Sequence, residues 1–229
     1  MGAVVVCSPA LIPSELKAED GRLYKRYNRV KLVNSHGTPL LFTQLVQEQA
    51  YIFNYPFRST PVMMIKLQDT TPKDITLKSA QGESYIWKGG VGTTGSLVAY
   101  SAICSHQLSH PTPDISFVAY SGQKKTSSCD KKGMIVCASH LSAFDPKNGA
   151  RQVAGPANEA LAATVLEVDT KGQIWAVGVL GPDKFHDFFK TFKDEFKEHY
   201  GGKRKAKKLV KDKADTQSIR DYSAEVVLI

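Results

Sequence analysis

Short apolar stretches separated by turn residues run from residue 29 to residue 180. Many of them alternate apolar and polar side chains or are rich in β-branched and aromatic residues, which is typical of strands. The clearest pair is Ala162–Val168 and Gln173–Val179, because Asp169-Thr-Lys-Gly172 between them is a strong hairpin signal. The predicted strands are Arg29–Val33, Pro39–Phe42, Ala50–Pro56, Thr60–Leu67, Ile75–Leu77, Ser84–Trp87, Leu97–Tyr100, Ile115–Tyr120, Gly133–Val136, Ala162–Val168 and Gln173–Val179. Their spacing predicts an all-β fold, either a sandwich or a barrel-like sheet.

One helix is predicted after the last strand. Five phenylalanines recur with the helical period and share one face: Phe185, Phe188, Phe189, Phe192 and Phe196. Pro182-Asp183 is a start signal for this helix, and Gly201-Gly202 is a stop signal. We expect the aromatic face to pack on the β scaffold, although a helix that binds a partner's groove has the same pattern.

Composition places the chain among ordinary globular proteins. It has 229 residues, 42% of them hydrophobic, and a formal charge of +8, which suits one substantial core. No apolar run reaches the roughly 18 residues of a membrane-spanning helix, and the N-terminus lacks the pattern of a secretory signal. The chain as given is therefore expected to be cytoplasmic or peripheral to a membrane, with a periplasmic-type location if an anchor was omitted.

Seven of the basic residues crowd the segment 203–213. A solvated helix face or tail is the simplest interpretation of such a run. The functional alternatives are a docking surface for an acidic partner or for anionic lipid, which would make the protein a peripheral membrane protein. Nucleic acid is disfavoured, because no aromatic side chains alternate with the lysines to stack on bases.

The four cysteines, at positions 7, 104, 129 and 137, are too few and too unevenly spaced for a disulfide framework. Two of them lie in short motifs with a histidine, Cys104-Ser-His106 and Cys137-Ala-Ser-His140. Thiolate and imidazole bind both iron and zinc, so the ligand types alone do not identify the metal. Structural zinc usually uses paired Cys-x2-4-Cys and His-x3-5-His motifs. Here each motif mixes one Cys with one His, which disfavours a zinc-stabilised β interaction module.

This part of the chain resembles the Rieske iron-sulfur family, in particular the branch of quinol-oxidising cytochrome bc complexes and arsenite oxidase small subunits. The two ligand motifs and Gly155-Pro-Ala157, which resembles the family's proline loop over the cluster, carry the likeness. The resemblance implies a [2Fe-2S] cluster with Cys104 and Cys137 on one iron and His106 and His140 on the other. The ligand histidines are then expected at an exposed tip, where a quinol or a partner's haem approaches. His110 is expected to cover the site without binding metal.

The chain also departs from the family pattern. Ser109 and Ser139 stand where many respiratory members have the cysteines of a disulfide, so we expect no disulfide across the cluster. Ser142 matches a serine that hydrogen-bonds a bridging sulfide in the family. Phe144 replaces a tyrosine whose hydroxyl donates a hydrogen bond in the family. Without this bond, the reduction potential should be lower than in family members that have the tyrosine. The potential should still lie in the Rieske window of about −150 to +300 mV, below its top.

The resemblance implies a one-electron carrier that passes electrons between a quinol or redox enzyme and a cytochrome. No catalytic residues are assigned, and the chain is not expected to turn over an organic substrate itself. The alternative within redox chemistry is a ferredoxin-like donor to an oxygenase. The expected organisation is an N-terminal arm (1–24), an antiparallel β base domain (25–182) with an inserted cluster-binding subdomain (about 101–157), and a C-terminal helix with a basic extension (183–229).

Overall fold

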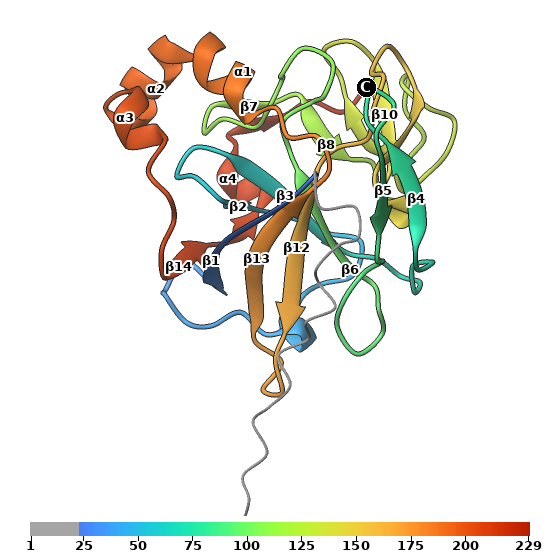
Figure 1. Ribbon diagram of the computed structural model, residues 1–229, viewed down its shortest axis with the longest axis horizontal. Coiled ribbons are helices and arrows are strands. Elements are labelled where there is room, and N and C mark those ends of the chain that lie inside the picture. Colours follow the sequence, from blue (N-terminus) through green and yellow to red (C-terminus); the bar gives the residue numbers. More distant parts are fainter. Residues whose placement is uncertain (1–22) are drawn as a thin grey trace, which may run out of the picture.

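The computed structural model describes residues 23–229, in which a large curved β-sheet carries a smaller sheet and a group of helices (Figure 1). The all-β prediction is confirmed, with the helices confined to the C-terminal part. Most of the expected N-terminal arm, including Cys7, lies outside the described residues. The large sheet has the strand order β14 (Lys213–Asp215), β1 (Tyr24–Val33), β13 (Ile174–Leu180), β12 (Ala163–Val168), β6 (Leu97–Ser101), β3 (Pro61–Lys66), β2 (Ala50–Asn54), β15 (Gln217–Ser218).

The C-terminal segment supplies both end strands of this sheet. β14 pairs in parallel with β1, with Ala214 opposite Leu32, and β15 pairs antiparallel with β2, with Gln217 opposite Ile52. Only Thr216 separates the two end strands in the chain. The segment therefore bridges the edge strands β1 and β2 and brings the sheet close to a closed barrel.

A four-stranded antiparallel sheet lies between β6 and β12 in the sequence. Its order is β11 (Arg151–Ala154), β10 (Ser142–Asp145), β9 (Ile135–Cys137), β8 (Val118–Tyr120). Two further pairs complete the fold: the hairpin of β4 (Ile75–Lys78) with β5 (Ser84–Trp87), and β7 (Ile115–Ser116) with β16 (Glu225–Val226). Two 3-10 turns, η2 (Phe42–Gln44) and η3 (Pro146–Asn148), lie in connections. Both candidate ligand motifs lie at the start of, or within, this insertion.

Two hydrophobic cores lie on opposite faces of the large sheet. Successive side chains of a strand point to opposite faces, and β3 shows the result: Val62 and Met64 join one core, whereas Met63 and Ile65 join the other. The first core is covered by the helices. The second core continues into the β4–β5 hairpin and the small sheet, so both pack directly on the large sheet.

The Phe-rich segment packs on the β scaffold as predicted, since four of its five phenylalanines are buried in the first core. It forms two helices where the sequence predicted one, α1 (Phe185–Thr191) and α2 (Lys193–Tyr200). The break is at Phe192, whose backbone leaves the helical region at φ −97° and ψ 45°. Two short helices follow, α3 (Lys203–Ala206) and α4 (Ile219–Tyr222).

Two strand predictions were wrong in detail. Pro39–Phe42 forms isolated bridges to Val33 and Gln173 and then a 3-10 turn, because Pro39 has no N–H with which to extend a ladder. Ile115–Tyr120 is interrupted at Phe117, so β7 and β8 join different sheets. No helix among residues 23–229 is long and apolar enough to cross a membrane.

Candidate metal centre

The first candidate ligand loop follows β6 and folds back on itself. The amide of Cys104 donates to the carbonyl of Ser109 at 2.8 Å, and the amide of Leu108 donates to the carbonyl of Cys104 at 3.0 Å. Leu108 takes a left-handed backbone conformation, with φ +65°, which is costly for a residue with a Cβ. This tight loop holds Cys104 buried, while His106 is half-buried at its surface.

The second ligand loop is the short connection between β9 and β10. Cys137 ends β9 and lies opposite Ser142 at the start of β10. The intervening turn contains Leu141, another left-handed residue with φ +57°. Cys137 is fully buried, whereas His140 is exposed. Each loop therefore places its cysteine inside and its histidine at the surface.

The two cysteines, 33 positions apart in the chain, meet through their thiols. The hydrogen bond from Cys104 lowers the pKa of Cys137 to about 6, against the effect of burial, with help from the Ser139 and His140 amides and the Ser109 hydroxyl. The same bond, together with burial, raises the pKa of Cys104. One thiol of the pair is therefore readily deprotonated, and the thiolate is the form that binds metal.

The two histidines also meet across the loops. Their ring centroids lie 5.0 Å apart, with an angle of 83° between the ring planes. The Nδ1 atom of His106 is buried and has no hydrogen-bond partner, an arrangement that costs free energy unless another group satisfies the nitrogen. An imidazole nitrogen of this kind is a suitable iron ligand, so the donor set fits a group held by two sulfurs and two ring nitrogens.

Within residues 23–229, no three His, Cys, Asp or Glu side chains converge as ligands of one metal ion. A two-iron centre of the Rieske kind takes only two protein ligands on each iron. The separate pairing of cysteines with cysteines and histidines with histidines matches that division better than it matches a single four-ligand zinc ion.

The predicted covering loop packs directly on the second ligand loop. Gly155 has φ +81°, and a Cβ at this position would collide with the Leu141 carbonyl oxygen and the Ser142 Cα. The buried Ser142 hydroxyl accepts a hydrogen bond from the Ala157 amide at 3.3 Å. Pro156 is exposed at the tip of this loop. The close approach explains why glycine is needed here.

Three other positions complete the surroundings of the ligands. The hydroxyls of Ser109 and Ser139 lie 3.0 Å apart and join the two loops. Phe144 is fully buried in the core that also contains Cys104 and Cys137. Its ring has no hydroxyl, so it offers no hydrogen bond to a group held between the loops. Among residues 23–229 the cysteines 104, 129 and 137 are free.

Sequence reasoning missed the contacts that the C-terminal segment makes with the first loop. His110 was expected only as cover, but its ring bonds the carboxylate of Glu195 in α2 at 2.9 Å. The buried carboxylate of Glu159, just after the covering loop, pairs with Lys184. No short-range pattern marks these partners, since 85 positions separate His110 from Glu195.

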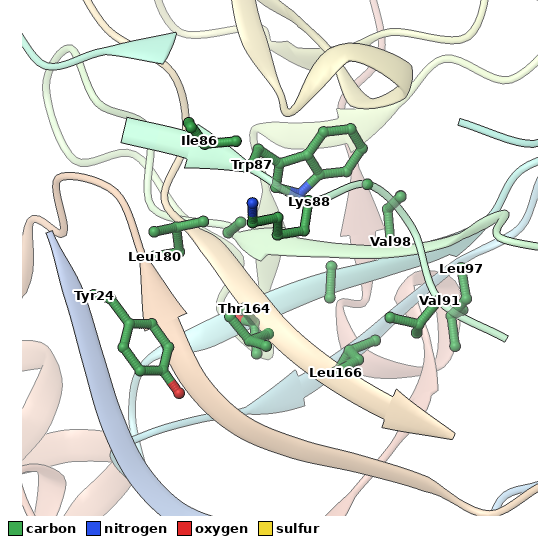
Figure 2. A pocket seen from close by; sticks show the side chains of 14 residues that line it. Tyr24, Ile86, Trp87, Lys88, Val91, Leu97, Val98, Thr164, Leu166 and Leu180 are labelled. Atoms are coloured by element: carbon green, nitrogen blue, oxygen red, sulfur yellow. The ribbon is translucent and has the colours of Figure 1, made fainter. Parts of the chain in front are cut away.

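An apolar cavity of about 200 Å³ lies elsewhere, between the β4–β5 hairpin and the large sheet. Figure 2 shows Trp87 and Lys88 on its hairpin side and Tyr24, Thr164 and Leu166 on its strand side. None of the four candidate ligands lines it. The candidate centre is therefore a surface feature built from paired loops, separate from this cavity.

The part of the chain that contains both ligand motifs matches a known protein family. Residues 61–168 match the family model of the Rieske [2Fe-2S] domain. The chain is similar to the soluble domain of the Rieske protein II (soxF) from Sulfolobus acidocaldarius, with 26% identity over 69% of this chain and 82% of that chain, at a TM-score of 0.47. It is also similar to the ferredoxin of carbazole 1,9a-dioxygenase from Nocardioides aromaticivorans IC177, with 17% identity over 68% of this chain and 99% of that one, at a TM-score of 0.37.

The matched residues include both Cys-His motifs and the covering loop. A Rieske domain holds a [2Fe-2S] cluster through two cysteines and two histidines. The family match, the orphaned nitrogen of His106 and the paired thiols lead to the same conclusion. The chain therefore carries a Rieske [2Fe-2S] domain in residues 61–168.

Proposed function

We propose that this protein is a one-electron carrier in which Cys104 and Cys137 bind one iron of the cluster and His106 and His140 bind the other. The observation that carries the proposal is the pairing of these side chains between the two loops, thiol with thiol and ring with ring. When bound, the [2Fe-2S] cluster supplies the capacity to accept and release one electron. We also propose that the cluster-binding subdomain spans residues 101–157, inserted in a base domain of residues 25–182, with a C-terminal extension from residue 183.

The protein side chains then control how electrons reach the centre. Cys104 and Cys137 are buried, so the iron that they are proposed to bind would be shielded from water. His140 is exposed, so its ring is the point at which a partner comes closest. With one ring nitrogen bound to iron, the other would be free to hydrogen-bond an approaching partner.

Exposed apolar side chains beside His140 suit a transient protein or quinol partner. Leu141, the next residue, is 41% exposed, and Phe117, whose carbonyl accepts a hydrogen bond from the Ala138 amide, is 36% exposed. Small apolar surfaces of this kind mark sites of contact. We propose that the partners are a quinol or redox enzyme as donor and a cytochrome as acceptor, on the likeness of the ligand motifs to the respiratory branch.

The basic segment 203–213 offers a second, weaker contact. Arg204, Lys205, Lys207, Lys208 and Lys211 are exposed on it. We propose that this segment makes peripheral contact with an anionic membrane surface, to which each basic residue contributes about 1 kcal/mol. Liposome flotation at low and physiological salt tests this part independently of the cluster.

Analysis of the purified protein tests the proposed function. Two irons and two acid-labile sulfides per chain are expected. The reduced protein should show hyperfine couplings from two histidine nitrogens in electron-nuclear double resonance, and replacing His140 should remove one of them. A colourless protein with one zinc and no sulfide would rule the proposal out. Reduction by a quinol, compared with reduction by a flavin-dependent ferredoxin reductase, distinguishes the respiratory partner from the alternative of an oxygenase donor.

A further inference from the structure

The first ligand loop is attached to the C-terminal helices through the side chain of His110. Its imidazole is buried, with 5% of the side chain exposed. The Nε2 atom lies 2.9 and 3.1 Å from the two carboxylate oxygens of Glu195. The Nδ1 atom lies 2.8 Å from the carbonyl oxygen of Leu108. The ring thus connects helix α2 to the backbone of the loop that contains Cys104 and His106.

Both groups that face the His110 ring are hydrogen-bond acceptors. A carbonyl oxygen cannot donate, and an ionised carboxylate cannot donate either. The ring therefore donates its Nδ1 hydrogen to the Leu108 carbonyl, and a second hydrogen bond joins Nε2 to the Glu195 carboxyl group. Because the site is largely closed to water, both bonds are stronger than they would be at an exposed position.

The Leu108 end of this connection is a strained position. Leu108 has φ +65°, and such a conformation persists in a residue with a side chain only where the surroundings enforce it. The bond from His110 to the Leu108 carbonyl is one such constraint, and the bond from the Leu108 amide to Cys104 is another. Leu108 is two residues from His106, so its conformation affects the direction of that imidazole.

Aromatic side chains of the helical segment pack against the His110 ring. Phe188 and Phe192 contact His110 edge-to-face, with centroid distances of 4.8 and 4.6 Å. A second ion pair, Lys184 with the buried Glu159, holds the same segment to the other side of the loop. There the carbonyl of Glu159 accepts a hydrogen bond at 3.0 Å from Ser105, which lies between the two candidate ligands.

We infer that His110 and Glu195 are positioning residues of the cluster site, through which the C-terminal helices hold the first ligand loop in its metal-binding conformation. The inference deepens the proposed function and rests on it for the identity of the ligands. Neither residue binds metal. Glu195 orients His110, His110 fixes Leu108, and Leu108 sets the loop that presents Cys104 and His106.

Hydrogen exchange of the protein as purified tests the connection without relying on the cluster. In Glu195→Ala the amides of Cys104 and Leu108 should exchange about tenfold faster or more, because the loss of a buried hydrogen bond removes local stability. Glu195→Gln keeps one acceptor and should give an intermediate increase. Glu198→Ala is the matched control, since Glu198 is an exposed acid on the same helix. Amides of β13 should be unchanged in all variants.

Spectroscopy of the reduced protein provides the second readout. Glu195→Ala and His110→Gln should each shift the electron paramagnetic resonance g values and shorten cluster lifetime, and the double variant should resemble His110→Gln alone. Glu198→Ala should have the wild-type spectrum. Unchanged loop exchange in Glu195→Ala, or equal effects in Glu198→Ala, would overturn the inference. A wild-type protein without a cluster would refute the proposed function. The exchange rates of the Cys104 and Leu108 amides would still show whether Glu195 and His110 hold the first ligand loop.

Discussion

The hydroxyl of Ser109 lies 3.0 Å from the hydroxyl of Ser139, and this hydrogen bond links the two ligand loops directly. By the resemblance of the ligand motifs to the respiratory branch, the two serines take the places of a pair of cysteines. The structure therefore brings the positions of the missing disulfide together and fills them with a weaker, reversible connection. A single hydrogen bond contributes about 1 kcal/mol, whereas a disulfide typically contributes about 2–4 kcal/mol.

Restoring the covalent link should slow cluster loss. In the double variant Ser109→Cys/Ser139→Cys the sulfurs should oxidise to a disulfide, because the side chains already face each other at close range. The closed loop should lengthen the lifetime of the cluster on heating, and a thiol reductant should abolish the gain. Thiol counting by mass spectrometry and the decay of visible absorbance measure the two effects. The single variants serve as controls, and free thiols in the oxidised double variant would contradict the prediction.

Replacing the exposed histidine tests the ligand assignment. His140→Cys exchanges a neutral imidazole for an anionic thiolate, which disfavours the added electron. The potential should fall toward the value of about −400 mV that is typical of clusters with four cysteine ligands. Protein-film voltammetry measures the shift. His36→Cys places the same residue on an exposed turn remote from the loops and should leave the potential unchanged. An unaltered potential in His140→Cys would remove His140 from the ligand set.

Ser142 should tune the potential through its buried hydroxyl. The oxygen accepts from the Ala157 amide, which leaves its own hydrogen available to a sulfide of the cluster. Removing a hydrogen bond to a charged group costs about 1.5–3 kcal/mol, equivalent to roughly 60–130 mV for one electron. Ser142→Ala should therefore have a lower potential, measured by redox titration. The shift should be at most this amount, because only the strengthening of the bond on reduction affects the potential.

The matched control for that variant is Ser116→Ala. Ser116 is equally buried, but its hydroxyl donates to the Val118 carbonyl at 2.7 Å. Its loss should affect stability without moving the potential. Equal potentials for Ser142→Ala and the wild type would show that the Ser142 hydroxyl is directed only at the protein.

Local patterns were enough to predict most of the strands and to mark the candidate ligands. Cys104, His106, Cys137 and His140 lie in short motifs whose spacing depends only on neighbouring residues. The turn at residues 169–172 likewise specifies its hairpin from the sequence alone. Features of this kind are encoded within a few residues, so the sequence reveals them without knowledge of the fold.

The parts that were not predicted depend on contacts between distant segments. β14 and β15 are very short strands whose pairing with β1 and β2 is set by the near-barrel they close. The break at Phe192 follows from packing, since Phe188 and Phe192 both turn toward His110. A helical period continues through this position in the sequence. Tertiary contacts override local propensity in such cases.

A comparison of Gly155 with Gly172 separates the cost of backbone strain from the cost of a steric collision. It has φ +81° and Gly172 has φ +76°, but only at Gly155 would a Cβ meet backbone atoms, those of Leu141 and Ser142. Nothing lies within 4 Å of a Cβ at Gly172. Gly172→Ala should therefore cost about 1–2 kcal/mol from the left-handed conformation alone. Gly155→Ala should cost more and displace the covering loop from the second ligand loop. Urea unfolding and cluster decay measure the pair, and equal decay in both variants would show that the loop does not protect the cluster.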